Sequence, residues 1–227
     1  MIDFGKLAAF SGQVLILNRR TLVKVCGITS LEDGLAAAAC GVDAVGFNFW
    51  AASSRYVETG QAAIISTQLP KSVKRVGLFV NEERGFIERV LAAVELDLLQ
   101  FHGDERHEAC GCFGLPYIKA IKASATDDIE REAAKYEDAS AILLDTPAQG
   151  AFGGSGESFD WNIVPPLDRP LILAGGLTPG NVADAIEQAN PCAVDVASGV
   201  EKSKGVKDLA LMQQFIAAVK QTNRSEL

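Results

Sequence analysis

The sequence contains no apolar run close to the roughly 20 residues that a helix needs to cross a bilayer. It also lacks a charged leader ahead of a long apolar core, since Asp3 and Lys6 come early and Arg19-Arg20 late. We therefore expect no signal peptide and a cytoplasmic protein. Basic residues are outnumbered, because 21 Lys and Arg face 29 Asp and Glu, for a formal net charge of -8. This balance disfavours nucleic-acid and membrane partners, so any anionic ligand must be held by a local site.

Paired cysteines are missing as well. The chain has five cysteines, an odd number, and none forms a CxxC spacing; Cys110 and Cys112 are separated by a single glycine. Neither a disulfide framework nor a zinc site is indicated, and we expect no metal. We expect structural or incidental roles for Cys40, Cys110, Cys112 and Cys192. Cys26 differs from them because of its position in the chain.

Cys26 ends an apolar, β-branched segment that is typical of a buried strand. Gly27 interrupts the segment, and Thr29-Ser30 marks the start of a helix. A strand-like segment followed by a helix-like segment recurs eight times along the chain. The expected strands cover residues 22–26, 44–47, 75–80, 96–101, 117–121, 141–144, 170–173 and 193–197, and the expected helices cover residues 31–40, 59–68, 82–94, 104–112, 126–136, 159–164, 179–189 and 207–220.

Eight such units with short apolar strands indicate an α/β fold, a single-domain (β/α)8 TIM barrel, although a doubly wound sheet would also satisfy the pattern. We assign residues 21–227 to the barrel and residues 1–20 to an N-terminal extension. The extension enters the first strand from its N-terminal end, so its apolar residues should cover the face opposite the active site. The helix at 159–164 is the weakest element, because Pro165-Pro166 cuts it short.

In a barrel, the C-terminal ends of the strands meet at one mouth, where ligands bind. The polar residues and glycines expected there are Cys26, Asn48, His102, Asp145, Gly175-Gly176 and Ser198-Gly199. Asp145 closes the sixth strand, and a carboxylate in that place is either a helix N-cap or a catalytic group. Because Thr146-Pro147 follows without an immediate helix, we favour catalysis. Cys26 and Asp145 would then approach a ligand from different sides.

Glycine-rich strand ends point to a bound anion. The loops after the seventh and eighth strands are the usual phosphate site of a barrel, and here they carry Gly175-Gly176 and Ser198-Gly199. The loop around Gly154 has the composition of a lid. Arg55, after the second strand, could bind a carboxylate or could be a solvated surface arginine. For His102 a site-lining role and a structural role are equally compatible with the sequence.

The motifs resemble those of one family, phosphoribosylanthranilate isomerase of tryptophan biosynthesis. They appear in the family's order from Thr21 onward, and residues 1–20 are the departure. The matching segments are Val23-Lys24-Val25-Cys26-Gly27-Ile28-Thr29, Ser54-Arg55-Tyr56-Val57, Gln100-Phe101-His102-Gly103, Leu143-Leu144-Asp145-Thr146, Gly153-Gly154-Ser155-Gly156, Phe159-Asp160-Trp161, Gly175-Gly176-Leu177 and residues 194–201.

The resemblance implies a cofactor-free Amadori rearrangement of a small phosphosugar, with Asp145 as general acid and Cys26 as general base. It also implies that Arg55 holds the anthranilate carboxylate, that the glycine loops with Gly154 hold the phosphate, and that His102 lines the site. The thiol's pKa, ordinarily about 8.5, must fall toward neutrality for this role. The oligomeric state, monomer or homodimer, stays open.

Two alternatives remain at this stage. The histidine-pathway isomerase performs the same rearrangement on a barrel, but it has aspartates at both catalytic strand ends, and Cys26 stands at the first of them. A noncatalytic phosphosugar-binding protein is the alternative from a different class. Loss of anthranilate fluorescence on adding the substrate would separate an isomerase from a binder.

A buried ion pair is also expected. Lys24 shares a face with Cys26 and should point into the barrel, where an ammonium is seldom left without a partner. Closure places the eighth strand beside the first, and Asp195 is the acidic residue within that strand. We therefore predict a Lys24–Asp195 pair, whose positive end would help to lower the pKa of Cys26.

Overall fold

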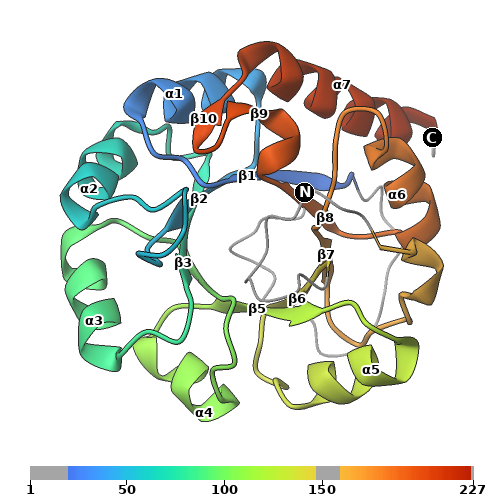
Figure 1. The fold of residues 1–227 in the computed structure, drawn as a ribbon, viewed down its shortest axis with the longest axis horizontal. Helices are drawn as coiled ribbons and strands as arrows, with labels where there is room; N and C mark the ends of the chain where they lie inside the picture. Colours follow the sequence, from blue (N-terminus) through green and yellow to red (C-terminus); the bar gives the residue numbers. More distant parts are fainter. Residues whose placement is uncertain (1–19, 147–158, 226–227) are drawn as a thin grey trace.

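Eight parallel strands form a closed barrel in the computed structural model, which describes residues 20–146 and 159–225 (Figure 1). Each strand pairs with its sequence neighbours, and β8 pairs with β1 to close the ring. The TIM barrel is therefore confirmed, and the doubly wound alternative is wrong. The strands are β1 (Leu22–Cys26), β2 (Ala44–Asn48), β3 (Lys74–Phe79), β4 (Leu98–Phe101), β5 (Tyr117–Lys122), β6 (Ala141–Asp145), β7 (Leu171–Leu173) and β8 (Ala193–Val196).

Seven α-helices of the described part surround the barrel (Figure 1). The first helix begins and ends where the sequence signals predict: Ser30 is the N-cap, its hydroxyl accepting from the Asp33 N–H, and Gly41 is the C-cap with φ of 88°. None of the described helices is long and apolar enough to span a membrane. The helices are α1 (Leu31–Cys40), α2 (Thr59–Gln68), α3 (Arg84–Ala93), α4 (His107–Cys110), α5 (Thr126–Ala134), α6 (Val182–Ala189) and α7 (Leu209–Ser225).

The structure differs from the expected helices in three places. The segment at 159–164 forms only a short 3₁₀ helix, η3 (Trp161–Ile163), since the two following prolines prevent propagation. The helix at 104–112 shrinks to α4 and a second 3₁₀ helix, η2 (Gly111–Phe113). The last helix begins at Leu209, because a small hairpin of β9 (Glu201–Ser203) and β10 (Val206–Lys207) precedes it.

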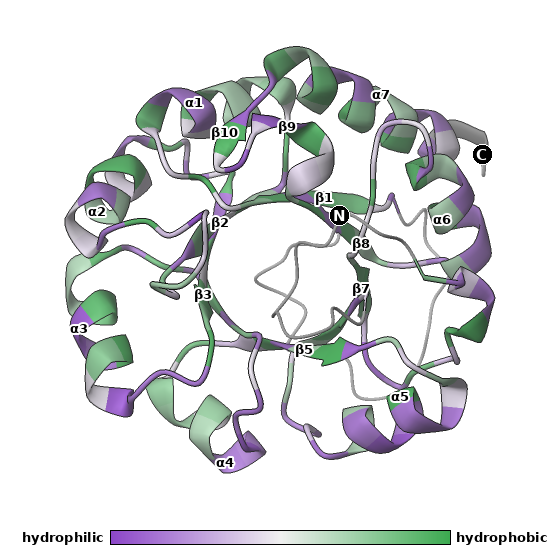
Figure 2. Cartoon of the chain, viewed as in Figure 1, coloured by the Kyte–Doolittle hydropathy of each residue, from purple (hydrophilic) through white to green (hydrophobic). Residues whose placement is uncertain are grey.

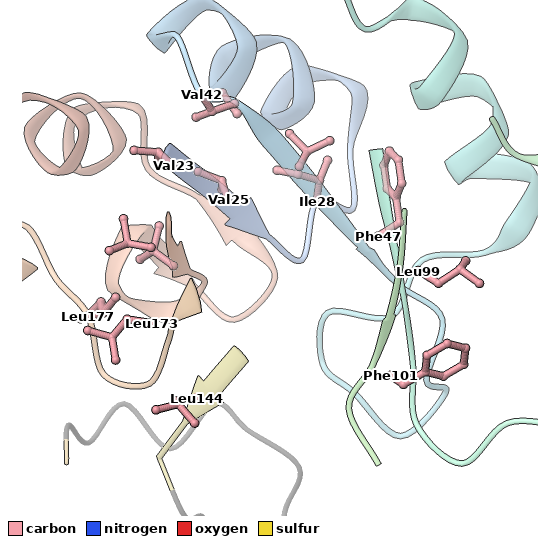
Figure 3. Close-up of a cluster of buried hydrophobic side chains, with 14 of the residues drawn as sticks. Val23, Val25, Ile28, Val42, Phe47, Leu99, Phe101, Leu144, Leu173 and Leu177 are labelled. Carbon is pink, nitrogen blue, oxygen red and sulfur yellow. The ribbon is translucent and has the colours of Figure 1, made fainter. Parts of the chain in front are cut away.

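Hydrophobic residues are concentrated on the ring of strands, whereas helices such as α5 carry many hydrophilic ones (Figure 2). Side chains two positions apart share a face of a strand, so Val23 and Val25 pack outward against the helices. Phe47 and Leu144 belong to the same outer cluster (Figure 3). This continuous core between strands and helices holds the barrel rigid and thereby fixes the relative positions of its strand ends.

The barrel interior is apolar at its N-terminal end and polar toward the mouth. The lower layer consists of Leu22, Ala44, Val76, Leu98, Ile118, Ala141, Ile172 and Ala193. Above it lie Lys24 and Asp195, which are register partners on β1 and β8. The Lys24 ammonium contacts both Asp195 carboxylate oxygens at 2.9 Å and is fully buried. The predicted ion pair is confirmed, and it joins the two strands that close the barrel.

The N-terminal extension lies outside the described residues up to position 19. Arg20, its last residue, pairs with Asp43 at the start of β2. The placement of the extension's apolar residues stays a prediction.

Candidate active site

Seven of the predicted site residues lie at the strand ends that form the mouth. Cys26 and Asp145 end β1 and β6, and His102 follows β4 directly. Gly175-Gly176 follows β7, and Ser198-Gly199 opens a short 3₁₀ helix, η4, after β8. Arg55 lies in the loop after β2, and Gly154 falls outside the described residues. Strands 1 and 6 are not neighbours in the barrel, so the thiol and the carboxyl face the mouth from different sides, as expected.

Asp145 is held by hydrogen bonds on both carboxylate oxygens. Its Oδ1 accepts from the Thr146 N–H at 2.8 Å, and its Oδ2 lies 3.1 Å from His102 Nε2. The other ring nitrogen, Nδ1, lies 3.0 Å from Gln100 Nε2, a donor on a fully buried side chain. With Gln100 in this orientation, Nδ1 accepts and Nε2 carries the proton that is donated to Asp145. His102 therefore orients the carboxyl. A cavity of about 1280 Å³ opens beside both residues, but it is lined mainly by the segments at 103–108 and 119–138 and not by Cys26, Arg55 or the two glycine loops.

Cys26 is buried to about the same degree as Asp145, with 7% of its surface exposed against 8%. Burial raises the pKa of its thiol, and Asp195 adds to this effect, while the ammonium groups of Lys24 and Lys207 lower it without reversing it. The expected fall of the thiol's pKa is therefore wrong for this structure, because desolvation outweighs the two cations. A Cβ on Gly46 of β2 would come within 2.7 Å of the Cys26 Sγ. Glycine at that position makes room for the thiol.

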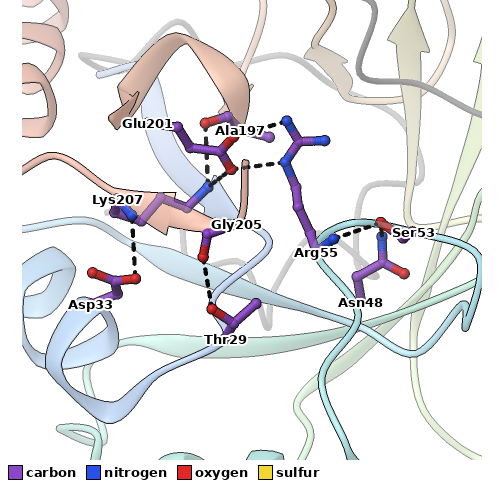
Figure 4. Close-up of polar contacts among 9 residues, drawn as sticks. All are labelled: Thr29, Asp33, Asn48, Ser53, Arg55, Ala197, Glu201, Gly205 and Lys207. Carbon is purple, nitrogen blue, oxygen red and sulfur yellow. Dashed lines mark hydrogen bonds and ion pairs between the residues drawn. The ribbon is translucent and has the colours of Figure 1, made fainter. Parts of the chain in front are cut away.

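Arg55 is neither a surface arginine nor an unpaired one. Its Nε donates to Glu201 Oε1 at 2.8 Å and its Nη2 to Glu201 Oε2 at 2.9 Å (Figure 4). Lys207 Nζ donates to the same Oε1 at 2.8 Å and to the Ala197 carbonyl at 3.2 Å. Burial opposes ionisation of Glu201, yet the hydrogen bonds and charges of Arg55 and Lys207 outweigh it and lower the pKa of that carboxyl. Burial lowers the pKa of the Lys207 ammonium.

The loop that carries Arg55 is organised by Asn48, which ends β2. Its Nδ2 donates to Ser53 Oγ at 3.0 Å, and its Oδ1 accepts from the Trp50 N–H at 2.9 Å. Ser53 Oγ also accepts from the Arg55 N–H at 3.1 Å. The predicted mouth residue Asn48 thus shapes the loop from which the guanidinium extends (Figure 4).

The two glycine loops approach each other, and the first also approaches the end of β6. Gly175 has φ of 82°, and a Cβ there would come within 2.9 Å of Asp145 Oδ1, so only glycine fits. A Cβ on Gly199 would lie 1.9 Å from the Leu177 carbonyl oxygen. Asn181 braces the first loop, accepting from the Thr178 N–H at 2.7 Å. The two loops therefore lie against each other, and the expectation that they hold a phosphate stays a prediction.

Sequence reasoning assigned no site role to Gln100, Glu201 or Lys207. Both Glu201 and Gln100 stood in the matched motifs. Nothing in the sequence indicated that Glu201 contacts Arg55, whereas the two-residue spacing of Gln100 and His102 along a strand could have indicated their contact. Lys207 was expected to begin a helix, and the Lys-Gly pair at 204–205, a turn signal, could have indicated the hairpin instead. Within the described ranges, no group of three His, Cys, Asp or Glu side chains is suited to hold a metal.

Comparisons with known proteins agree with this geometry. A profile of the N-(5′-phosphoribosyl)anthranilate (PRA) isomerase family matches residues 23–218. N-(5′-phosphoribosyl)anthranilate isomerase of Pseudomonas aeruginosa (strain LESB58) is 53% identical over 205 residues, which cover 90% of this chain and 97% of that protein.

Two solved structures support the same relationship. Phosphoribosyl anthranilate isomerase from Thermotoga maritima has a TM-score of 0.82 and 44% identity, covering 88% of this chain and 99% of that one. A phosphoribosyl anthranilate isomerase in complex with reduced 1-(o-carboxyphenylamino)-1-deoxyribulose 5-phosphate has a TM-score of 0.78 and 42% identity, with the same coverage. The barrel, the residues at its mouth and these matches together show that the chain belongs to the N-(5′-phosphoribosyl)anthranilate isomerase family.

Proposed function

We propose that the protein converts N-(5′-phosphoribosyl)anthranilate to 1-(2-carboxyphenylamino)-1-deoxyribulose 5-phosphate in tryptophan biosynthesis, with no cofactor. Family membership supports the reaction. The observation that carries the mechanism is the pair of proton-transfer groups, Cys26 and Asp145, that ends two non-adjacent strands of one barrel. The reaction needs protons moved at two different substrate atoms, which two groups on different sides of a ligand can do.

Asp145 is the general acid. It protonates the furanose ring oxygen, the ring C–O bond breaks, and the anilino nitrogen lone pair forms the Schiff base. Its carboxyl is oriented for this step by the Thr146 N–H and by His102. Cys26, as thiolate, then removes the C2′ proton, and the electron pair moves to give the enolamine, which tautomerises to the ketone.

The raised pKa of Cys26 makes the thiol its dominant form in the unliganded protein. The thiol must therefore lose its proton before it can act as the base. The ammonium groups of Lys24 and Lys207 favour the thiolate when it forms.

The substrate's two anionic ends fit the cationic and glycine-rich parts of the mouth. Arg55 takes the anthranilate carboxylate, and the loops at Gly175-Gly176 and Ser198-Gly199 take the phosphate. His102 lies beside the acid, with Nε2 3.1 Å from Asp145 Oδ2. The protein thus binds its substrate at both ends and leaves the ribose between the acid and the base.

The test is turnover by Cys26→Ala and Asp145→Asn, followed as the loss of the substrate's anthranilate fluorescence. Each variant should lose roughly 10² to 10⁴ in kcat, because each lacks one proton-transfer group, while circular dichroism and phosphate binding stay as in the wild type. Near-wild-type turnover by either variant would reject its role. A wild-type protein that binds the substrate without consuming it would be a phosphosugar-binding protein instead.

A further inference from the structure

The contact between Arg55 and Glu201 leaves a defined part of the guanidinium unused by this carboxylate. A guanidinium has five N–H donors in a plane. Glu201 occupies one edge of it, with Nε and Nη2 donating to the two carboxylate oxygens at 2.8 and 2.9 Å. The other edge, formed by Nη1 and the second hydrogen of Nη2, is the one left to face a second planar anion.

Glu201 is held independently of Arg55. It begins the β9–β10 hairpin, and two contacts fasten that hairpin to the first strand–helix unit (Figure 4). Thr29 Oγ1 donates to the Gly205 carbonyl at 2.7 Å, and the Lys207 N–H donates to Asp33 at 3.2 Å. A fixed carboxylate therefore restrains a long and otherwise flexible arginine side chain.

The charges of the cluster do not cancel. Arg55 and Lys207 are cations and Glu201 is the anion that both contact, which leaves one positive charge. The Lys207 side chain is fully buried, Glu201 is 4% exposed and Arg55 is 14% exposed. A largely buried cluster with one uncompensated positive charge is suited to one monovalent anion.

The cluster also lies beside the proposed base. The stem of Arg55 crosses Gly27, the residue after Cys26, so closely that a Cβ there would lie 2.6 Å from Arg55 Cδ. The guanidinium of Arg55 therefore lies near the end of β1 that carries Cys26, where a substrate with a carboxylate on its ring would meet both groups.

From these contacts we infer that Glu201 is a positioning residue for substrate recognition. It holds Arg55 so that the free edge of the guanidinium faces the substrate's carboxylate, and Lys207 balances the negative charge of Glu201. The inference rests on the proposed function, since it concerns how that site reads the anthranilate ring. Glu201 itself does not touch the substrate.

The test compares Glu201→Gln with the wild type using two competitive inhibitors. One is the reduced product, in which the ketone is an alcohol; the other is the same molecule without the ring carboxylate. Glutamine keeps the volume but loses the charge and one acceptor. We expect the Ki of the carboxylated inhibitor to rise about tenfold and the Ki of the other to change less than about twofold. The KM for the substrate should rise together with the Ki of the carboxylated inhibitor, whereas kcat should change less than about threefold.

The control is Glu88→Gln, which breaks an exposed Arg–Glu contact of 2.7 Å on α3 and should change neither Ki. In an Arg55→Ala background, Glu201→Gln should no longer affect the carboxylated inhibitor, because the group it positions is gone. This second comparison also separates a positioning role from a defect in folding, which would persist in that background.

Equal changes in both Ki values, or no change in either, would overturn the inference. So would a loss confined to kcat, which would mean that Glu201 acts on Cys26. Wild-type protein that discriminates between the inhibitors but does not consume the substrate would reject the proposed function and leave the inference standing. Wild-type protein that consumes the substrate but binds both inhibitors equally would support the proposed function and overturn the inference.

Discussion

Removing one partner of the Lys24–Asp195 pair should destabilise the protein severely. The Lys24 ammonium has no exposed surface and contacts both oxygens of Asp195, which is 7% exposed. Lys24→Met keeps most of the side-chain volume but leaves a buried carboxylate without its cation, and we expect a loss of about 3 to 5 kcal/mol in the free energy of unfolding. Since small and medium domains are stable by only about 5 to 15 kcal/mol, this is a large fraction of the total.

Replacing both partners should recover much of that loss. In Lys24→Met/Asp195→Leu no charge stays buried, so we expect at least half of the single-variant penalty to disappear. The assay is urea unfolding followed by circular dichroism, with the slope checked for constancy. Lys74→Met is the control, because its partner Asp97 and Lys74 itself are about a quarter exposed, and its loss should stay below about 1 kcal/mol.

The same variants test the coupling of barrel closure to the base. Lys24 lowers the pKa of Cys26 by its charge and by a hydrogen bond, and this outweighs the opposite effect of Asp195. The folded double variant should therefore still have a poorer thiolate and a lower kcat even though its stability has recovered. A Lys24→Met protein that loses less than about 1 kcal/mol would refute the energetic argument. A double variant as unstable as the sum of the single variants would refute it as well.

Four further predictions follow from particular contacts and from the raised pKa of Cys26. In Gly46→Ala the new Cβ would lie 2.7 Å from the Cys26 Sγ, so kcat should fall about tenfold or more and the free energy of unfolding should fall by about 1 to 3 kcal/mol. Turnover and urea unfolding measure the two effects, and an unchanged kcat would show that the thiol can move at no cost. Alkylation of Cys26 by iodoacetamide, followed by peptide mass spectrometry, should keep accelerating above pH 8.5, since burial raises the thiol's pKa; a plateau near neutrality would contradict this. The same raised pKa stabilises the folded state below the unfolded pKa of about 8.5, and this contribution should be lost as the pH rises through the folded value. Ser30→Ala should lower the free energy of unfolding in urea by about 1 kcal/mol without affecting kcat, because it removes only the N-cap hydrogen bond that Ser30 accepts from the Asp33 N–H.

Much of the barrel is determined by local pattern in the sequence. Short apolar strands followed by helices, each with its own start and stop signals, predicted all eight strands to within two residues at either end. The same pattern identified which residues end the strands, and hence Cys26 and Asp145. Alternation along a strand and closure of the ring together predicted the Lys24–Asp195 pair. The period of two determines which side chains point into the barrel, and the right-handed parallel units determine which strands are neighbours.

The tertiary structure alone decided the contacts made by loops. Arg55 and Glu201 are 146 residues apart, and neither is in a periodic segment whose facing the sequence could predict. The hairpin that carries Glu201 and Lys207 was hidden for the same reason. The contact between Gln100 and His102 is different, because the two residues are two positions apart at the end of β4 and the alternation of a strand could have indicated it. The pKa of Cys26 was predicted in the wrong direction, because it depends on the balance between burial and nearby charge. Charged neighbours can be read from strand order, but the depth of burial is determined only when the whole barrel has closed around the thiol.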